Sequence, residues 1–208
     1  MDNEGKPRGY EAVHCGAPGC MAESYHAYRN GEPFLRKLGI KKNQTFETFR
    51  KIPEALESFN AARDFAEGKA ENIFLLVYGG VGCGKSHLCN AVAVSLSERN
   101  VPFIFKESDD LLSLLRASIG DGNTEKEIQN IKDTPVFILD DYKPDRDSTW
   151  AISRIEEIIS YRYNALAMTL VTTNLQSSQL PERIFSRFSE IGTSKKVLNA
   201  APDYRRTG

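Results

Sequence analysis

The sequence predicts an α/β fold in which a parallel β-sheet carries helices on both faces. Apolar runs of strand length occupy residues 73–78, 135–139 and 167–171, and segments with helical periodicity separate them. Alternating strands and helices require crossover connections, which make the strands parallel and bury both faces of the sheet. Each of the three runs also ends in residues suited to phosphate or metal chemistry, and such sheets bind their ligands at that edge.

The residues after the first apolar run form a phosphate-binding loop. Residues 79–86 read GGVGCGKS and match G-x-x-x-x-G-K-[ST] at every fixed position. Backbone N–H groups of such a loop surround phosphate, Lys85 supplies a cation, and the Ser86 hydroxyl is a ligand for Mg²⁺. A helix expected over 85–96 points the positive end of its dipole at the same place. We expect ATP to bind at nine consecutive residues: Gly79, Gly80, Val81, Gly82, Cys83, Gly84, Lys85, Ser86 and His87.

The chain between this loop and the next acidic motif alternates strand and helix. Residues 102–105 are expected to form a strand and residues 108–118 a helix. The leucines of that helix share one face, so we predict that they belong to the core and not to a zipper surface: Leu111, Leu112 and Leu115. A further helix is expected over 149–163.

The second apolar run, 135–139, delivers Asp140 and Asp141 to the carboxyl end of a buried strand. At this edge Asp140 is suited to hold Mg²⁺ together with Ser86, and Asp141 is suited to polarise the attacking water. Paired acids after a strand are also common in solvated turns. Their place downstream of the phosphate loop favours the catalytic interpretation.

The third run, 167–171, leads into Thr172, Thr173 and Asn174 at the same edge. An uncharged amide there can hydrogen-bond the γ-phosphate and the lytic water. The alternative is that Asn174 caps a helix beginning near Ser177, a role that Asn fills readily.

A short amphipathic helix is expected over 181–188. Its Arg183 and Arg187 are four residues apart and therefore share one face. Surface arginines on a helix are ordinarily solvated or paired with an acid such as Glu182 or Glu190.

The segments GGVGCGKSHL, VFILDD, LVTTNL and ERIFSRF, in this order, resemble the AAA+ helicase-loader family, the DnaC/DnaI-like proteins. The resemblance spans roughly Thr45 to the C-terminus. It implies an AAA+ P-loop NTPase core with little or no C-terminal lid domain. It also implies an ATP- and Mg²⁺-dependent protein that engages a replicative helicase and helps to place it on single-stranded DNA.

In this resemblance Arg187 matches the family's arginine finger, which reaches into the ATP site of a neighbouring subunit. Hydrolysis would then need self-association through the ATP interfaces. Arg183 is a less certain member of the pair, and Arg205 or Arg206 is a weak candidate for a second phosphate sensor. Most of the superfamily has Glu where this chain has Asp141, and the shorter side chain predicts slow hydrolysis.

Two domains are expected, a loosely structured N-terminal arm over residues 1–44 and the ATPase domain over 45–208. The arm is rich in Gly and Pro and lacks apolar periodicity. It contains two His and two Cys that are suited to zinc, although their spacing favours an unmetallated tail: His14, Cys15, Cys20 and His26. It is also a candidate for partner binding.

Composition and charge limit the kinds of partner that we expect this chain to bind. The 208 residues are 40% hydrophobic with a formal net charge of −1, which argues against nonspecific coating of DNA. No stretch is long enough to span a bilayer and no signal-peptide core is present, so we expect a cytoplasmic protein with no membrane partner. Cysteines in that compartment are reduced.

Two functions remain open at this stage. The first is an ATP-dependent loader of the replicative helicase. The second is an IstB-like transposition helper, which shares the core motifs but binds duplex DNA for a transposase. A near-neutral charge favours the loader, because continuous coating of duplex needs a larger basic surface. A module that has lost catalysis is poorly supported, since Lys85, Asp140 and Arg187 are all present.

Overall fold

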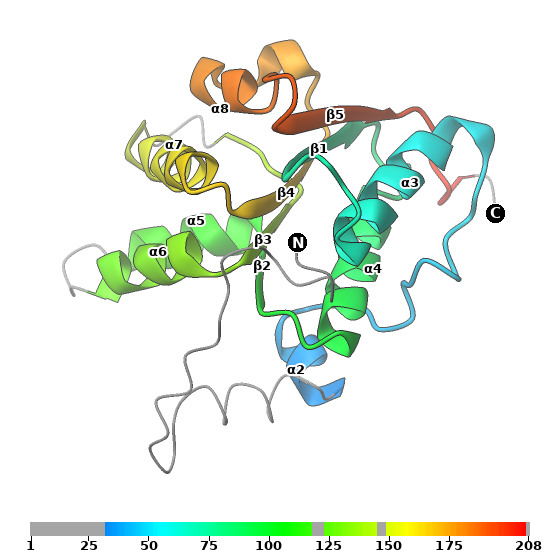
Figure 1. Ribbon diagram of the computed structural model, residues 1–208, viewed down its shortest axis with the longest axis horizontal. Coiled ribbons are helices and arrows are strands. Elements are labelled where there is room, and N and C mark those ends of the chain that lie inside the picture. The colour runs from blue at the N-terminus through cyan, green and yellow to red at the C-terminus, as the bar shows by residue number, and fades with distance from the viewer. Residues whose placement is uncertain (1–31, 118–122, 145–148, 207–208) are drawn as a thin grey trace.

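The computed structural model describes residues 32–117, 123–144 and 149–206, and within them five parallel strands form one sheet. The order across the sheet is β2-β3-β4-β1-β5 (Figure 1). The strands are β1 (Phe74–Gly79), β2 (Phe103–Glu107), β3 (Val136–Asp140), β4 (Met168–Thr173) and β5 (Ser194–Asn199). The predicted parallel α/β fold is confirmed. No helix or strand occupies residues 200–206.

Helices cover both faces of the sheet (Figure 1). One face carries α2 (Glu32–Lys37), α3 (Pro53–Glu67) and α4 (Lys85–Glu98), and the other carries α5 (Ser108–Ala117), α6 (Asn123–Asp133) and α7 (Thr149–Asn164). A 3₁₀ turn (Ser177–Gln179) and α8 (Glu182–Arg187) connect β4 to β5. Alternate residues of β1 serve the two cores, because strand side chains point to opposite faces. Leu75 and Val77 pack with α3 and α4, whereas Phe74 and Leu76 pack on the other side.

Part of the expected N-terminal arm packs against the domain. Within residues 32–44, Leu35 and Ile40 are buried in the core beneath α3 and α4. The ring of Phe34 meets that of Phe103 in β2 edge to face, with 6.1 Å between centroids. Residues 32–44, which the sequence assigned to the loose arm, therefore pack against the sheet and its helices. The zinc candidates His14, Cys15, Cys20 and His26 lie outside the described residues.

The three predicted leucines of α5 are buried, which confirms their assignment to the core: Leu111, Leu112 and Leu115. None of the described helices has the length and apolar character needed to cross a membrane.

Candidate functional site

The candidate site lies where β1, β3 and β4 end. A cavity of about 690 Å³ opens at this carboxyl edge of the sheet. The phosphate loop, the end of β3, Asn174 and the C-terminal segment around Tyr204 and Arg205 all line it. Parallel strands bring these segments together because their carboxyl ends share one edge. The predicted acids Asp140 and Asp141 both face this cavity.

Lys85 is a buried cation at the first turn of α4, with only 6% of its surface exposed. Its Nζ donates hydrogen bonds to the carbonyl oxygens of Gly79 (3.1 Å) and Gly80 (2.7 Å) and to Oδ1 of Asn174 (2.7 Å). All three acceptors are uncharged, and no carboxylate of the described residues pairs with this ammonium group. Burial of a charge without a counter-ion is costly, so the site suits an anion such as phosphate.

The phosphate loop requires glycine at two positions. Gly82 and Gly84 have φ values of +75° and +97°, a region that other residues rarely adopt. A Cβ on Gly82 would lie 1.7 Å from Oδ1 of Asp203, and one on Gly84 would lie 2.9 Å from the ring of Phe49. The loop is therefore packed closely from outside as well as curved around its interior.

The C-terminal segment supports the outer side of this loop. The side-chain amide of Asn199 donates to the carbonyl oxygen of Cys83 (3.0 Å). The backbone N–H of Tyr204 donates to the carbonyl oxygen of Gly82 (3.1 Å). The hydroxyl of Tyr204 then reaches the carbonyl of Arg50 (3.1 Å). Residues 199–204 thus join the loop to the segment ahead of α3.

Asp140 is buried at the end of β3, where Thr172 of β4 holds it. The Thr172 hydroxyl donates to Oδ1 of Asp140 (2.5 Å) and accepts the backbone N–H of Asp141 (3.0 Å). Ser86 lies exposed in the same cavity. A hydroxyl and a carboxylate are hard oxygen ligands of the kind that Mg²⁺ prefers, so these two residues fit the predicted metal site.

The surroundings of Asp140 are strongly acidic. Glu107 stands opposite Asp140 in the pairing of β2 with β3. Burial raises the pKa of Glu107, and the charges of Asp140, Asp110 and Asp141 raise it further. Carboxylates concentrated at one edge favour a divalent cation there.

Asp141 has a left-handed backbone, with φ of +52°, and both of its carboxylate oxygens are engaged. Asn174 donates to Oδ1 (2.5 Å), and Nζ of Lys143 lies 2.8 Å from Oδ2. The hydrogen bond that Lys143 donates to Asp141 is the main reason that the pKa of Lys143 is raised. Asn174 therefore bridges Lys85 and Asp141.

The alternative role of Asn174 as a helix cap finds no support among its described contacts. The backbone N–H of Gln176 ahead of the 3₁₀ turn is bonded instead to the side chain of Gln179 (2.8 Å). The amide of Asn174 is used by Lys85 and Asp141.

His87 and Cys83 lie at the loop but differ in exposure. Nε2 of His87 lies 2.9 Å from the carbonyl of Thr45, which can only accept, so this nitrogen carries the proton. Burial lowers the pKa of His87, and the bond to Thr45 partly opposes that effect. Cys83 and Cys89 are free and buried. Val81, by contrast, is exposed at the tip of the loop.

The arginines predicted from the last helix do not line the nucleotide cavity of their own chain. The guanidinium of Arg187 lies over the ring of Tyr163 in α7, 4.7 Å from its centroid, and Arg183 is exposed on α8. Arg205 lines the cavity, whereas Arg206 is exposed and lies 3.6 Å from Asp203.

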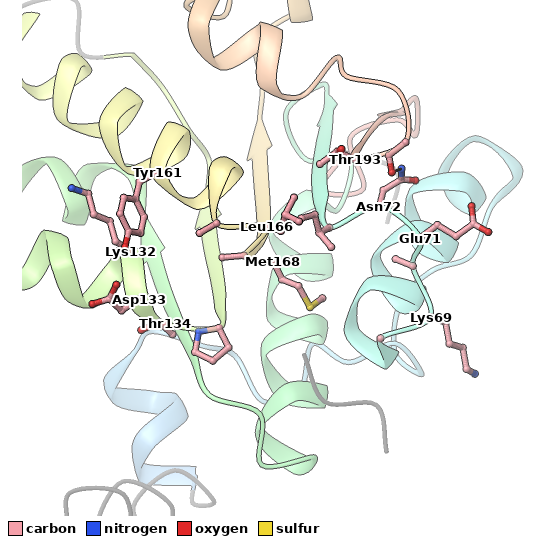
Figure 2. Close-up of a pocket in the computed structure, with 17 residues that line it drawn as sticks. Lys69, Glu71, Asn72, Lys132, Asp133, Thr134, Tyr161, Leu166, Met168 and Thr193 are labelled. Carbon is pink, nitrogen blue, oxygen red and sulfur yellow. Dashed lines mark hydrogen bonds between the residues drawn. The ribbon is translucent and has the colours of Figure 1, made fainter. Parts of the chain in front are cut away.

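A larger cavity of about 880 Å³ lies at the opposite, amino edge of the sheet (Figure 2). The segments that precede β1, β3, β4 and β5 line it, with Tyr161, Leu166 and Asn72 among its walls. It contains none of the predicted site residues. Size alone therefore does not identify the functional cavity.

Sequence reasoning missed two residues of the site. Thr172 was read only as part of a strand end, and its contact with Asp140 depends on strand register. Lys143 lies in a connection with no motif of its own. For Lys143 the available signal was its place two residues after the predicted acidic pair, whereas Thr172 offered no such local signal.

The sheet order, the phosphate loop and the acidic strand end define an AAA+ P-loop nucleotide-binding protein. The family model for the IstB-like ATP binding protein matches residues 37–184, and the chain belongs to this family. ATP binding is the property that the family description carries.

The chain is similar to two curated proteins and to one solved structure that represent its relatives. It is 23% identical to the replicative helicase loader DnaI of Bacillus subtilis, over 81% of this chain and 56% of that protein. It is 26% identical to a protein of Mycobacterium tuberculosis described as ATP-binding and from an insertion sequence, over 82% of this chain and 72% of the other. A crystal structure of the DnaC helicase loader superposes with a TM-score of 0.64 and 26% identity, covering 75% of this chain and 96% of that one. The predicted resemblance to helicase loaders and IstB-like proteins is confirmed.

The first curated relatives are longer proteins. The chain spans 56% of the length of DnaI, and 34% and 35% of the length of two further curated relatives, both chromosomal replication initiator proteins DnaA of Borrelia species.

Proposed function

We propose that this protein is an ATP-dependent loader of the replicative DNA helicase onto single-stranded DNA, and that it hydrolyses ATP slowly at subunit interfaces in the cytoplasm. The observation that carries the ATP site is the buried Lys85 ammonium, which donates only to uncharged acceptors and lines the same cavity as the carboxylates of Asp140 and Asp141. The similarity to DnaI and to the DnaC helicase loader supports the choice of partner.

The residues of the site have separate tasks in hydrolysis. Lys85 exchanges its carbonyl acceptors for phosphate oxygens, which supply the missing negative charge. Ser86 and Asp140 would hold Mg²⁺, with Thr172 fixing the carboxylate, and the metal would there supply positive charge to the phosphate oxygens.

Asp141 and Asn174 act on the water. As the water oxygen bonds to the γ-phosphorus, the bond to the bridging oxygen breaks and ADP leaves with that electron pair. The Asp141 carboxylate accepts the water proton, and Asn174 keeps the carboxylate aligned with Lys85.

Arg187 completes the site of a neighbouring subunit. It does not line its own nucleotide cavity and rests on Tyr163, which supports a role at the ATP site of another chain. Mixing Arg187→Ala with Lys85→Ala protein tests this directly. Each variant alone should be inactive, and the mixture should regain part of the activity because intact fingers meet intact loops. Arg183→Ala, on the same helix, is the matched comparison.

The central experiment measures ATP hydrolysis by the purified chain alone, with single-stranded DNA and with duplex DNA. A second assay follows transfer of a purified hexameric helicase onto a single-stranded circle. Single-strand stimulation with ATP-dependent transfer supports the loader. Tight ATP binding without single-strand stimulation and without transfer of the helicase would refute the loader function.

The second candidate function is an IstB-like transposition helper that binds duplex DNA. The family match and the similarity to the insertion-sequence protein favour it. Stimulation by duplex alone would select this function over the loader. The net charge of −1 argues for the loader, because duplex coating relies on a basic surface.

A further inference from the structure

Lys143 is the one cation among the described residues within ion-pair distance of Asp141. Its Nζ lies 2.8 Å from Oδ2, while Asn174 donates to Oδ1 at 2.5 Å. Both carboxylate oxygens therefore have strong donors. These two contacts hold the carboxylate in one orientation, so it must give up the contact with Lys143 before it can turn toward a water.

The backbone at Lys143 is held in place from a different element. Its N–H donates to Oγ of Ser108 (3.2 Å), and Ser108 is buried at the start of α5. The left-handed turn at Asp141 directs the chain from β3 into this position, and the N–H of Tyr142 bonds the carbonyl of Thr172 (2.7 Å). The ion pair thus joins two residues whose backbones are fixed independently.

We propose that Lys143 is a positioning residue that restrains ATP hydrolysis by holding Asp141 away from its role toward water. This inference rests on the proposed ATPase function. Asp141 acts only when the pair with Lys143 is open, and Asn174 alone then aligns the carboxylate. The side chains are 50% and 35% exposed, so the pair is weakly held and opens readily.

The test compares full-length variants in steady-state ATP hydrolysis with saturating Mg²⁺. Lys143→Met removes the charge and keeps most of the side-chain length. It should raise kcat by about two- to fivefold, the range that rupture of an exposed ion pair allows. KM is followed in the same assay, because Lys143 lines the same cavity as the phosphate loop and loss of a direct contact with nucleotide would raise KM instead of kcat.

Two matched variants separate positioning from a general effect of losing a lysine. Lys143→Arg keeps the ion pair and should restore the wild-type kcat. Lys69→Met removes an exposed lysine that pairs with Glu67 (2.6 Å) and lines the amino-edge cavity, and should leave kcat unchanged. Circular dichroism and thermal unfolding check that each variant folds, and Lys143→Gln replaces Lys143→Met if that one does not.

The outcomes are distinct. A higher kcat for Lys143→Met than for the wild type supports the restraint. Measurable hydrolysis by Lys143→Met beside an undetectable wild-type rate supports it as well. An unchanged or lower kcat beside an active wild-type protein overturns it and leaves the ATPase function standing. No hydrolysis by either protein overturns both.

Discussion

The hydroxyl of Thr172 and the carboxylate of Asp140 form a hydrogen bond of 2.5 Å across strands β3 and β4. Both residues are buried, and the same hydroxyl also accepts the N–H of Asp141. One side chain thus sets the position of Asp140, the expected Mg²⁺ ligand, and of the backbone of Asp141, the acid that we propose to activate water.

The first prediction concerns this hydroxyl. Thr172→Val keeps the shape of the side chain and removes the donor, so Asp140 loses its partner and the N–H of Asp141 its acceptor. We expect kcat for ATP hydrolysis to fall by about tenfold, with stability lowered by about 1 to 2 kcal/mol. Thr172→Ser keeps the hydroxyl and should retain most activity. Equal rates for Thr172→Val and the wild type would show that Asp140 needs no such support.

A second prediction concerns Arg162, whose side chain is fully buried. Its guanidinium donates to carbonyls at the end of α6 and at the starts of β3 and β4, including those of Ile131 (2.7 Å), Thr134 (2.6 Å) and Met168 (2.6 Å). Arg162→Met leaves these acceptors buried without donors, and should lower the free energy of unfolding by about 3 to 5 kcal/mol.

The control for Arg162 is Arg154 on the same helix. Arg154 pairs with Glu125 and Glu157 at 2.6 and 2.8 Å near the surface, so Arg154→Met should cost less than about 1 kcal/mol. Urea denaturation of both variants gives the comparison. Similar losses for the two would mean that the buried hydrogen bonds of Arg162 contribute little.

The sequence predicted the central strands because their apolar runs end in recognisable motifs. It did not predict β5, since SKKVLN looks polar and only Val197 and Asn199 of that strand are buried. Lysines on an edge strand protect it from pairing with other chains, and they also hide it from a hydrophobicity pattern. Contacts that depend on register were equally hidden. The pairing of Leu139 with Val171 is what brings Asp140 beside Thr172.

The burial of Arg162 could not be predicted from the sequence either. A charged residue in a helical segment is expected at the surface. It is buried here because the turns before β3 and β4 present their carbonyls to it, and no local pattern reveals that convergence.

A third prediction concerns Tyr142, whose hydroxyl is buried and has no hydrogen-bond partner among the described residues. Burial and the charge of Glu156 raise the pKa of this hydroxyl well above its usual value, so it stays neutral. Tyr142→Phe removes an unsatisfied polar group without changing the ring. We expect the free energy of unfolding to rise by about 1 kcal/mol. A loss of stability in urea denaturation would mean that the hydroxyl has a partner in solution.

The last prediction is a pH dependence from His87. Burial lowers its pKa below the usual 6.5 in the folded protein, while the unfolded chain keeps the usual value. As pH falls below 6.5, the unfolded state gains a proton before the folded state does, so stability present above pH 6.5 is lost towards the folded pKa. His87→Gln cannot titrate and should not show this loss. We would measure the free energy of unfolding of both proteins at about pH 7.5 and about pH 5.5, since carboxylates common to both cancel in the difference. The wild type should lose more stability on acidification than His87→Gln, and equal losses would show that the ring is solvated in the folded protein.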